Sequence, residues 1–338
     1  MKNVMNTSRS GRPPRVTFII PHRETESIDN VLRCVRALDH PQKSIEVLAV
    51  SGDQPSVQRN ACIRKAKGEI VYFLDNDSEV HAGNITHAVS LFQKDERIAV
   101  VGGPAEPKES DTAIQKVFSF CLCSPFGAGP VRSRYHAEGD VRETTDRELI
   151  LCNLLVRKKV LDTVGVFNEA FYPNEENELM DRIRDAGYAL YYHPRVAVRR
   201  SPRTDMRSFV KMLLNYGRGR FQQFIHAPRI LNVMFFIPLG FVLYLASLAA
   251  LPFATVLSPY ALIYLAPLGL YALFLTAAAF SALPSIRKLS FSILAVPFVF
   301  FAIHAGYGVG IIWGFIRLFR KRKMSAHFKI RTVKAFSR

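Results

Sequence analysis

Two carboxylates, one residue apart, stand directly after an apolar run in the segment VYFLDNDS, residues 71–78. If the backbone turns after a strand there, Asp75 and Asp77 can converge on one hard cation. Mg2+ or Mn2+ prefers such oxygen ligands and takes the remaining ligands from phosphates and water. A cation held there would bridge a diphosphate and stabilise it as a leaving group. A solvated turn with an Asx cap is the alternative interpretation.

Two further polar residues are expected at the same edge. Asp53 follows the apolar run 45–50, and Arg59 lies in a predicted helix over 57–67. Asp53 could accept a hydrogen bond from a nucleobase imide, and Arg59 could steady a diphosphate. The alternatives are a turn residue and a surface helix residue.

A pair of glutamates opens a predicted helix over 175–187. Glu175 and Glu176 could interact only with the helix dipole, or one of them could be a general base that deprotonates an acceptor hydroxyl. Further along, Arg218 and Arg220 lie beside an aromatic residue in YGRGRF, residues 216–221. Their planar guanidinium groups suit phosphate binding, and a basic face that snorkels to a membrane surface is the alternative.

The segments that must position these residues alternate between short apolar runs, typical of buried strands, and apolar residues at helical spacing. Apolar runs at 16–20, 45–50, 69–74 and 98–102 predict strands, and helical spacing occurs over 27–38, 57–67 and 83–94. This alternation predicts a mostly parallel α/β sheet flanked by helices, in which ligands bind at the carboxyl ends of the strands. Residues 148–156 predict another buried strand. The segment 124–147 is rich in Gly, Pro and charge, and it predicts a mobile loop over the site.

The last third of the chain has the composition of a membrane region. Residues 230–286 and 289–316 contain no Lys, Arg, Asp or Glu. The first run is long enough for two spans with a turn at 252–259, and the second for one span or a broken pair. Wholly enclosed core helices are the alternative. Three simple spans would put the basic tail outside, so a break at 306–310 that returns the tail to the cytosol is favoured.

The net charge of +17 is concentrated beside these apolar runs, because residues 317–338 hold nine Lys and Arg and no acid. Basic residues next to spans favour anionic membrane lipid over nucleic acid as the partner. Residues 1–15 are polar and basic and do not resemble a signal peptide. The five cysteines lack Cys-x-x-Cys spacing, which is typical of a reducing compartment. The predicted location is the cell (inner) membrane, multi-pass, with the amino-terminal region in the cytosol.

Five motifs in order resemble those of the family 2 glycosyltransferases, and most closely the membrane-anchored, succinoglycan glucosyltransferase-like group. They are FIIPHRETE, PSVQRNACIRKAKGEIVYFLDNDS, VGVFNEAFYPNEENELMDRIRDAGY, YGRGRF and HAGYGVG. The resemblance implies a GT-A nucleotide-diphospho-sugar transferase fold. It implies a division into a disordered tail (1–14), a catalytic domain (15–205), an interfacial amphipathic helix (206–229), a transmembrane region (230–318) and a basic tail (319–338).

The resemblance also implies roles for single residues. Pro21 and Glu24 would begin the nucleotide site, with Asp53 and Arg59 near the nucleotide. Asp75 and Asp77 would hold Mg2+ or Mn2+ on the diphosphate of the donor, expected to be a UDP-sugar. Glu176, or failing it Glu175, would be the base of an inverting transfer, and Arg218 and Arg220 would grip a phosphate of the donor or the acceptor.

The implied acceptor is a polyprenyl-linked saccharide in cell-surface or exopolysaccharide assembly. Two alternatives are a transferase that acts on polyprenyl phosphate itself and a catalytically silent membrane scaffold. The chain departs from the family in having Glu176 where Asp is usual, and in retaining a single acid, Asp53, in the second-strand segment. Gly217 and Phe221 stand where processive members have Gln and Trp, which favours the addition of a single sugar.

Overall fold

The computed structural model describes residues 12–226, 228, 230–249, 260–286, 292–317 and 328–333. An eight-stranded sheet forms its centre, with strand order β11-β2-β1-β3-β8-β5-β9-β7. The strands are β1 (Val16–His22), β2 (Ile45–Gly52), β3 (Ile70–Leu74), β5 (Ile98–Gly102), β7 (Arg142–Thr144), β8 (Asn153–Arg157), β9 (Ala189–Tyr192) and β11 (Phe328–Val333). A smaller sheet joins β4 (Glu79–Val80), β10 (Val198–Arg199) and β6 (Ala105–Glu106).

The large sheet is mixed, but most of its strands share one direction. β1 pairs in parallel with β2 and β3, and β5 pairs in parallel with β9. β8 lies antiparallel between β3 and β5, and β7 and β11 are antiparallel edge strands. The prediction of a mostly parallel α/β fold is confirmed.

Helices cover both faces of the sheet because the strands are apolar on both sides. One core joins the sheet to α1 (Asp29–Arg36) and α3 (Asn84–Lys94). The core on the other face joins it to α2 (Pro55–Lys65), α6 (Lys158–Val164) and α7 (Glu175–Asp185). The strand and helix spans predicted from periodicity agree with these bounds to within a few residues.

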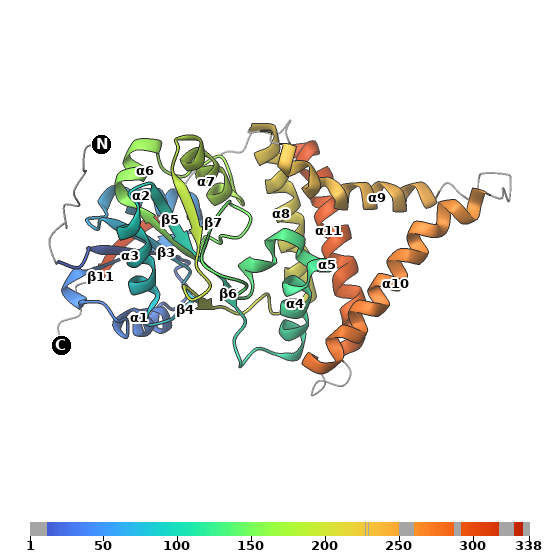
Figure 1. The fold of residues 1–338 in the computed structure, drawn as a ribbon, viewed down its shortest axis with the longest axis horizontal. Coiled ribbons are helices and arrows are strands. Elements are labelled where there is room, and N and C mark those ends of the chain that lie inside the picture. The colour runs from blue at the N-terminus through green and yellow to red at the C-terminus, as the bar shows by residue number, and fades with distance from the viewer. Residues whose placement is uncertain are drawn as a thin grey trace, which may run out of the picture.

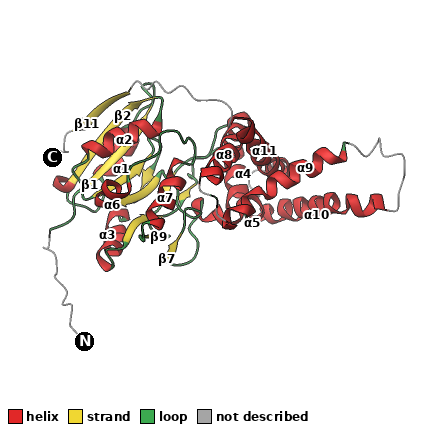
Figure 2. Cartoon of the chain, turned by 90° about the horizontal axis from the view of Figure 1, so that it is seen from above, coloured by secondary structure: helices red, strands yellow, loops and turns green. Residues whose placement is uncertain are grey.

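A third apolar core lies beside the sheet domain and contains helices only. It joins α4 (Ala113–Cys123) and α8 (Met206–His226) to α10 (Tyr260–Ile286) and α11 (Val296–Arg317). Figure 1 shows α8 and α11 next to the sheet domain, while α9 (Ile237–Leu248) and α10 project away from it. Figure 2 shows the same arrangement from above. Short 3-10 helices occur at Gln42–Ser44 (η1), Gly129–Arg134 (η2), Ile230–Phe236 (η3) and Ser292–Ala295 (η6).

Two of the described helical segments, Leu262–Ala282 and Ile293–Arg317, are long and apolar enough to cross a membrane. The most apolar stretch of the first contains no buried residue, and the second is partly covered by protein. The predicted turn at 252–259 and the charged pair at 287–288 lie outside the described residues. The predicted break at 306–310 is wrong, because α11 is one continuous helix through these positions.

The glycines of that segment allow close packing instead of ending the helix. Gly306, Gly310 and Gly314 follow one side of α11 and face α8, where a Cβ on Gly310 would clash with the Leu214 carbonyl. In return, a Cβ on Gly217 of α8 would clash with the Tyr307 carbonyl. The two helices are therefore in backbone contact, in a parallel arrangement.

The basic tail was predicted to be an anchor beside the membrane. For residues 328–333, the part of the tail that the structure describes, this prediction is wrong. Residues 328–333 form β11, which pairs antiparallel with β2 from Phe328 opposite Gly52 to Val333 opposite Val47. Lys329 and Arg331 therefore lie on the catalytic sheet and not beside the apolar helices. The rest of the tail and residues 1–11 lie outside the described residues.

Candidate active site

The carboxyl ends of three adjacent parallel strands form one edge of the sheet. β1 ends at His22, β2 is followed by Asp53, and β3 is followed by Asp75. β3 is the buried floor of this edge, because all five of its residues are buried. Asp75 and Asp77 come at the point where the buried backbone turns outward, as in other sheets that bind ligands at their strand ends.

Asp75 and Asp77 both face the guanidinium of Arg200, which follows β10. Arg200 Nη2 lies 2.9 Å from Asp75 Oδ2, and Arg200 Nε lies 2.9 Å from Asp77 Oδ1. Burial by itself would lower the pKa of Arg200. The negative charges of Asp75 and Asp77 outweigh this effect and raise the pKa well above its usual value. The three side chains thus form one compact charged cluster.

Arg59 connects this cluster to the start of α7. Its guanidinium contacts Asp75 Oδ1 at 3.3 Å and Glu175 Oε1 at 3.1 Å. The Arg59 side chain is almost fully buried, so the predicted alternative of a surface helix residue does not hold. The next residue, Asn60, bonds the Phe167 carbonyl at 2.8 Å and ties α2 to the segment before α7.

The carboxylates of Asp75 and Asp77 suit a divalent cation. One guanidinium reaches both of them, so their oxygens converge within the reach of a single positive group. The described residues contain no group of three or more His, Cys, Asp or Glu arranged for metal binding. Two protein carboxylates leave most positions of a six-coordinate ion to phosphate and water, the usual pattern for Mg2+ bound with a phosphate substrate.

The two glutamates of α7 have different environments. Glu175 is buried and paired with Arg59, whereas Glu176 is half-buried and lines a cavity. Burial, followed by the charge of Glu176, raises the pKa of Glu175 to about 7. The acid one turn further along α7, Glu178, pairs with Arg182 at 2.7 Å. The geometry separates a structural glutamate from one that can reach a ligand.

Two cavities meet at this site. One, of about 300 Å³, is lined by Asp77 and Arg200 and extends between α4 and α8. The other, of about 350 Å³, is lined by Glu176 and by apolar residues of α4, α8, η3 and α11. The cavities share four wall residues: Leu122, Tyr135, Ile150 and Tyr216. Asp77, which follows β3, and Glu176 of α7 therefore border neighbouring spaces.

The two arginines of the YGRGRF motif point to different places. Arg218 donates to the Tyr172 carbonyl at 2.7 Å. Arg220 is buried, forms an ion pair with Asp146 at 3.1 Å, and lines the cavity that contains Glu176. The two residues are not brought together, and only Arg220 borders a cavity of the site.

The nucleotide-binding residues implied by the resemblance are spread along one side of the site. Pro21 is buried within β1, in register with Val50 of β2. Glu24 lies in the loop after β1 and lines an open cavity with His22 and Ser51. Asp53 is exposed immediately after β2.

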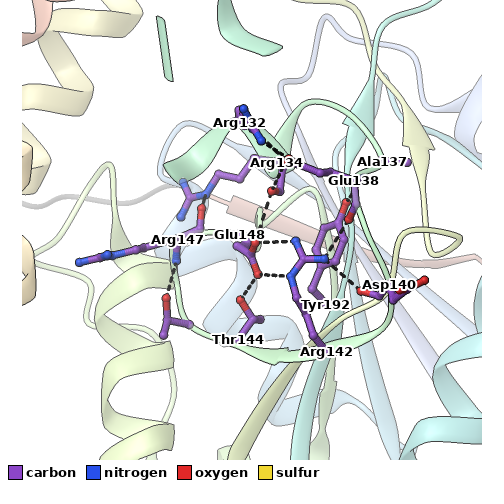
Figure 3. A network of polar contacts seen from close by, with 12 residues as sticks. Arg132, Arg134, Ala137, Glu138, Asp140, Arg142, Thr144, Arg147, Glu148 and Tyr192 are labelled. Carbon is purple, nitrogen blue, oxygen red and sulfur yellow. Dashed lines mark hydrogen bonds and ion pairs between the residues drawn. The ribbon is translucent and has the colours of Figure 1, made fainter. Parts of the chain in front are cut away.

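The segment 124–147, predicted to be a mobile loop, contains ordered elements, and that prediction is corrected. It forms α5 (Pro125–Ala128), η2 and β7. Figure 3 shows the charged network that fixes it: Arg142 pairs with Glu148 at 2.6 Å and stacks 4.3 Å from the Tyr192 ring, and Arg132 pairs with Glu138. The charged side chains that led to the prediction of a mobile loop instead form ion pairs with one another.

Arg200 is the residue of this site that the sequence analysis missed. It is 123 residues from Asp77, and it follows a strand of only two residues. Lys108 was also missed, and it donates to the Asp77 carbonyl at 3.0 Å. The local signal for Arg200 was a short apolar run, residues 196–198, followed by two arginines.

Comparisons with known proteins identify the family to which the chain is similar. A family model described as glycosyltransferase like family 2 matches residues 1–215. Glycosyltransferase AglE of Haloferax volcanii is 25% identical over 242 residues, which are 62% of this chain and 74% of AglE. Succinoglycan biosynthesis protein ExoA of Rhizobium meliloti is 28% identical over 114 residues, which are 34% of this chain and 33% of ExoA.

The fold resembles that of a solved transferase. Mannosyltransferase PcManGT from Pyrobaculum calidifontis, solved with GDP-Man and Mn2+, superposes with a TM-score of 0.55 at 18% identity. The alignment covers 90% of this chain and 88% of PcManGT. At this identity the likeness concerns the fold.

Proposed function

The chain belongs to glycosyltransferase family 2, and we propose that it moves a sugar from a nucleotide-diphosphate donor to a lipid-linked saccharide at a membrane surface. The observation that carries the proposal is the meeting of two cavities at one wall, one containing Asp77 and the other Glu176. Inverting transfer needs the base and the leaving group on opposite sides of the reacting carbon. Neighbouring cavities with these residues support that arrangement.

At the donor end, Asp75 and Asp77 would hold Mg2+ or Mn2+. A bound divalent cation supplies positive charge that stabilises the diphosphate as it leaves. Arg59 and Arg200 already border these carboxylates and can contact phosphate oxygens through their planar guanidinium groups. The presence of GDP-Man and Mn2+ in PcManGT supports a donor of this class.

At the acceptor end, Glu176 is the proposed base. Glu175 is less suited, because its carboxylate is buried and engaged by Arg59. Glu176 would take the proton of the acceptor hydroxyl while that oxygen attacks the anomeric carbon and the nucleoside diphosphate leaves. Arg220 borders the same cavity and would lie close to an acceptor phosphate, although it is already paired with Asp146.

The membrane location of the acceptor is supported by the composition of the second cavity. Its walls include Phe126, Leu213, Phe235, Ile237 and Ile303, several of them from the apolar helices. A lipid-linked saccharide would place its apolar part among these helices and its sugar beside Glu176. ExoA is named as a succinoglycan biosynthesis protein, which supports a role here in polysaccharide assembly. We propose an inner-membrane enzyme with its catalytic domain in the cytoplasm. We keep the domain boundaries predicted above, except that residues 328–333 belong to the sheet of the catalytic domain.

A donor screen tests the proposal. Purified protein with Mn2+ and membrane lipid extract is given labelled UDP- and GDP-sugars, and the lipid phase is assayed for label. Asp75→Ala and Glu176→Gln should each reduce transfer by about 10²-fold or more. Glu169→Gln, a nearby acid that bonds Asn60, is the matched control.

Three outcomes decide between this proposal and its alternatives. Label on an endogenous lipid-linked saccharide, lost in both variants, supports it. Transfer to added bare polyprenyl phosphate alone would favour a polyprenyl-phosphate glycosyltransferase. No transfer from any donor, or equal transfer in wild type and both variants, would favour a silent scaffold.

A further inference from the structure

The C-terminal strand borders an open cavity at the nucleotide side of the site. This cavity, of about 580 Å³, is lined by the end of β1, the loop and helix start over 24–29, Ser51 of β2, and residues 329–331 of β11. Its volume is in the range of small-molecule sites. The wall farthest from β1 is therefore supplied by a segment that follows all the apolar helices in the sequence.

The pairing register brings β11 to the ligand end of the sheet. β11 runs antiparallel to β2, so its first residues lie beside the last residues of β2, with Lys329 opposite Ser51. Ile330 packs against the core on the α2 face, which anchors the strand. Side chains alternate along a strand, so Lys329 and Arg331 extend to the other face, and all three residues border the cavity.

Lys329 and Glu24 form a complementary pair at this cavity. Lys329 Nζ lies 4.0 Å from Glu24 Oε1, and the Lys329 side chain is 86% exposed. An exposed ion pair of this length contributes little to stability, so both groups can turn to a ligand at small cost. An ammonium donates and a carboxylate accepts, and together they match a ring that presents a carbonyl oxygen next to an N–H.

We propose that β11 completes the nucleotide subsite and that Lys329 reads the nucleobase of the donor. Uracil and guanine each present a ring carbonyl beside an N–H, whereas adenine and cytosine present an amino group beside an unprotonated nitrogen. Lys329 donates to the carbonyl oxygen, and Glu24 accepts from the N–H. The inference rests on the proposed nucleotide-diphosphate donor, and it assigns the base-reading role to the C-terminal strand.

Calorimetry on the full-length protein in detergent with Mn2+ tests this inference, with UDP, GDP, CDP and ADP as probes. Wild type should bind UDP or GDP at least tenfold more tightly than ADP and CDP. Lys329→Ala should weaken that preferred binding about tenfold, which is about 1.4 kcal/mol. The same substitution should leave the affinities for ADP and CDP almost unchanged. Lys329→Arg keeps a donor and should recover much of the loss.

The matched control is Thr332→Ala, because Thr332 lies on the same strand and does not line the cavity. A Lys329→Ala protein that retains both affinity and base preference overturns the inference while leaving the donor class intact. If the wild type binds none of the four nucleotides, the proposed donor itself is wrong. An equal loss for all four nucleotides would mean that Lys329 contacts phosphate, and would also overturn base reading.

Discussion

Arg200 competes with any cation for the same two carboxylates. Its guanidinium is 2.9 Å from an oxygen of Asp75 and of Asp77, and it neutralises charge that would otherwise attract a metal. Arg200→Ala should therefore bind Mn2+ more tightly in the absence of donor, by about tenfold. It should also transfer sugar more slowly, because a diphosphate contact is lost. Titration of Mn2+ followed by electron paramagnetic resonance measures the affinity.

The control for this experiment is Arg199→Ala, since Arg199 is the adjacent residue and pairs with the exposed Glu109, at 3.6 Å. Its Mn2+ affinity should equal that of wild type. A Mn2+ affinity for Arg200→Ala at or below the wild-type value would show that Arg200 does not compete with the cation.

Glu175 makes stability depend on pH in a direction that can be worked out. Burial and the Glu176 charge raise its folded-state pKa from 4.5 to about 7. The folded protein then holds a proton that the unfolded chain has lost, so this stabilisation is complete below about pH 4.5 and is lost as pH rises to about 7. The full effect is at most about 3 kcal/mol.

Thermal unfolding of wild type and Glu175→Gln from pH 4.5 to 8 measures this effect. Gln does not titrate, so the stability of wild type relative to the variant should fall over that interval. Glu176→Gln removes a neighbouring negative charge, which lowers the Glu175 pKa, and it should shift the fall to lower pH. If wild type and Glu175→Gln differ in stability by the same amount at every pH of the interval, Glu175 is ionised throughout in the folded protein.

At the scale of elements, the contact between α8 and α11 depends on glycine. A Cβ at Gly217 would clash with the Tyr307 carbonyl, a backbone atom that cannot move alone. Gly217→Ala should force the helices apart and lower the free energy of unfolding by about 1–3 kcal/mol. Transferase activity should also fall, because Tyr216, the residue before Gly217, lines both cavities of the site.

Gly269→Ala on α10 is the matched control. No atom of the described residues lies within 4 Å of the position where its Cβ would be, and alanine favours the helix. Its melting temperature in the same detergent should equal or exceed that of wild type. Equal melting temperatures for Gly217→Ala and wild type would contradict the proposed close contact.

The elements of the sheet domain could be predicted because their signal is local. The buried strands are continuous apolar runs, and Asp75 and Asp77 follow one of them directly. β11 was missed although FKIRTV alternates apolar and basic residues, which is a strand pattern, because its charge and position suggested a membrane anchor. Arg200 could not be found from local pattern, since its partner Asp77 lies 123 residues away, in the turn after β3.

At the scale of the whole molecule, β11 limits how the chain can cross a membrane. The strand pairs with β2 over six residues, so it lies on the same side as the catalytic domain. A chain that leaves one side and returns to it crosses an even number of times, and α10 and α11 are the two described helices long enough to do so. For a chain that spans the membrane, this pairing favours the two crossings of α10 and α11 over three simple spans, and no break in α11 is needed.

Cysteine labelling in sealed vesicles tests this topology. In a background with all five native cysteines replaced, Glu96→Cys reports the catalytic domain and Ser337→Cys reports the tail. A membrane-impermeant maleimide should label both positions in inside-out vesicles and neither in right-side-out vesicles. Labelling of the two positions from opposite sides would mean that β11 does not pair with β2 in the membrane. The Lys329 contribution to the nucleotide cavity would then be lost as well, because one pairing register fixes both features.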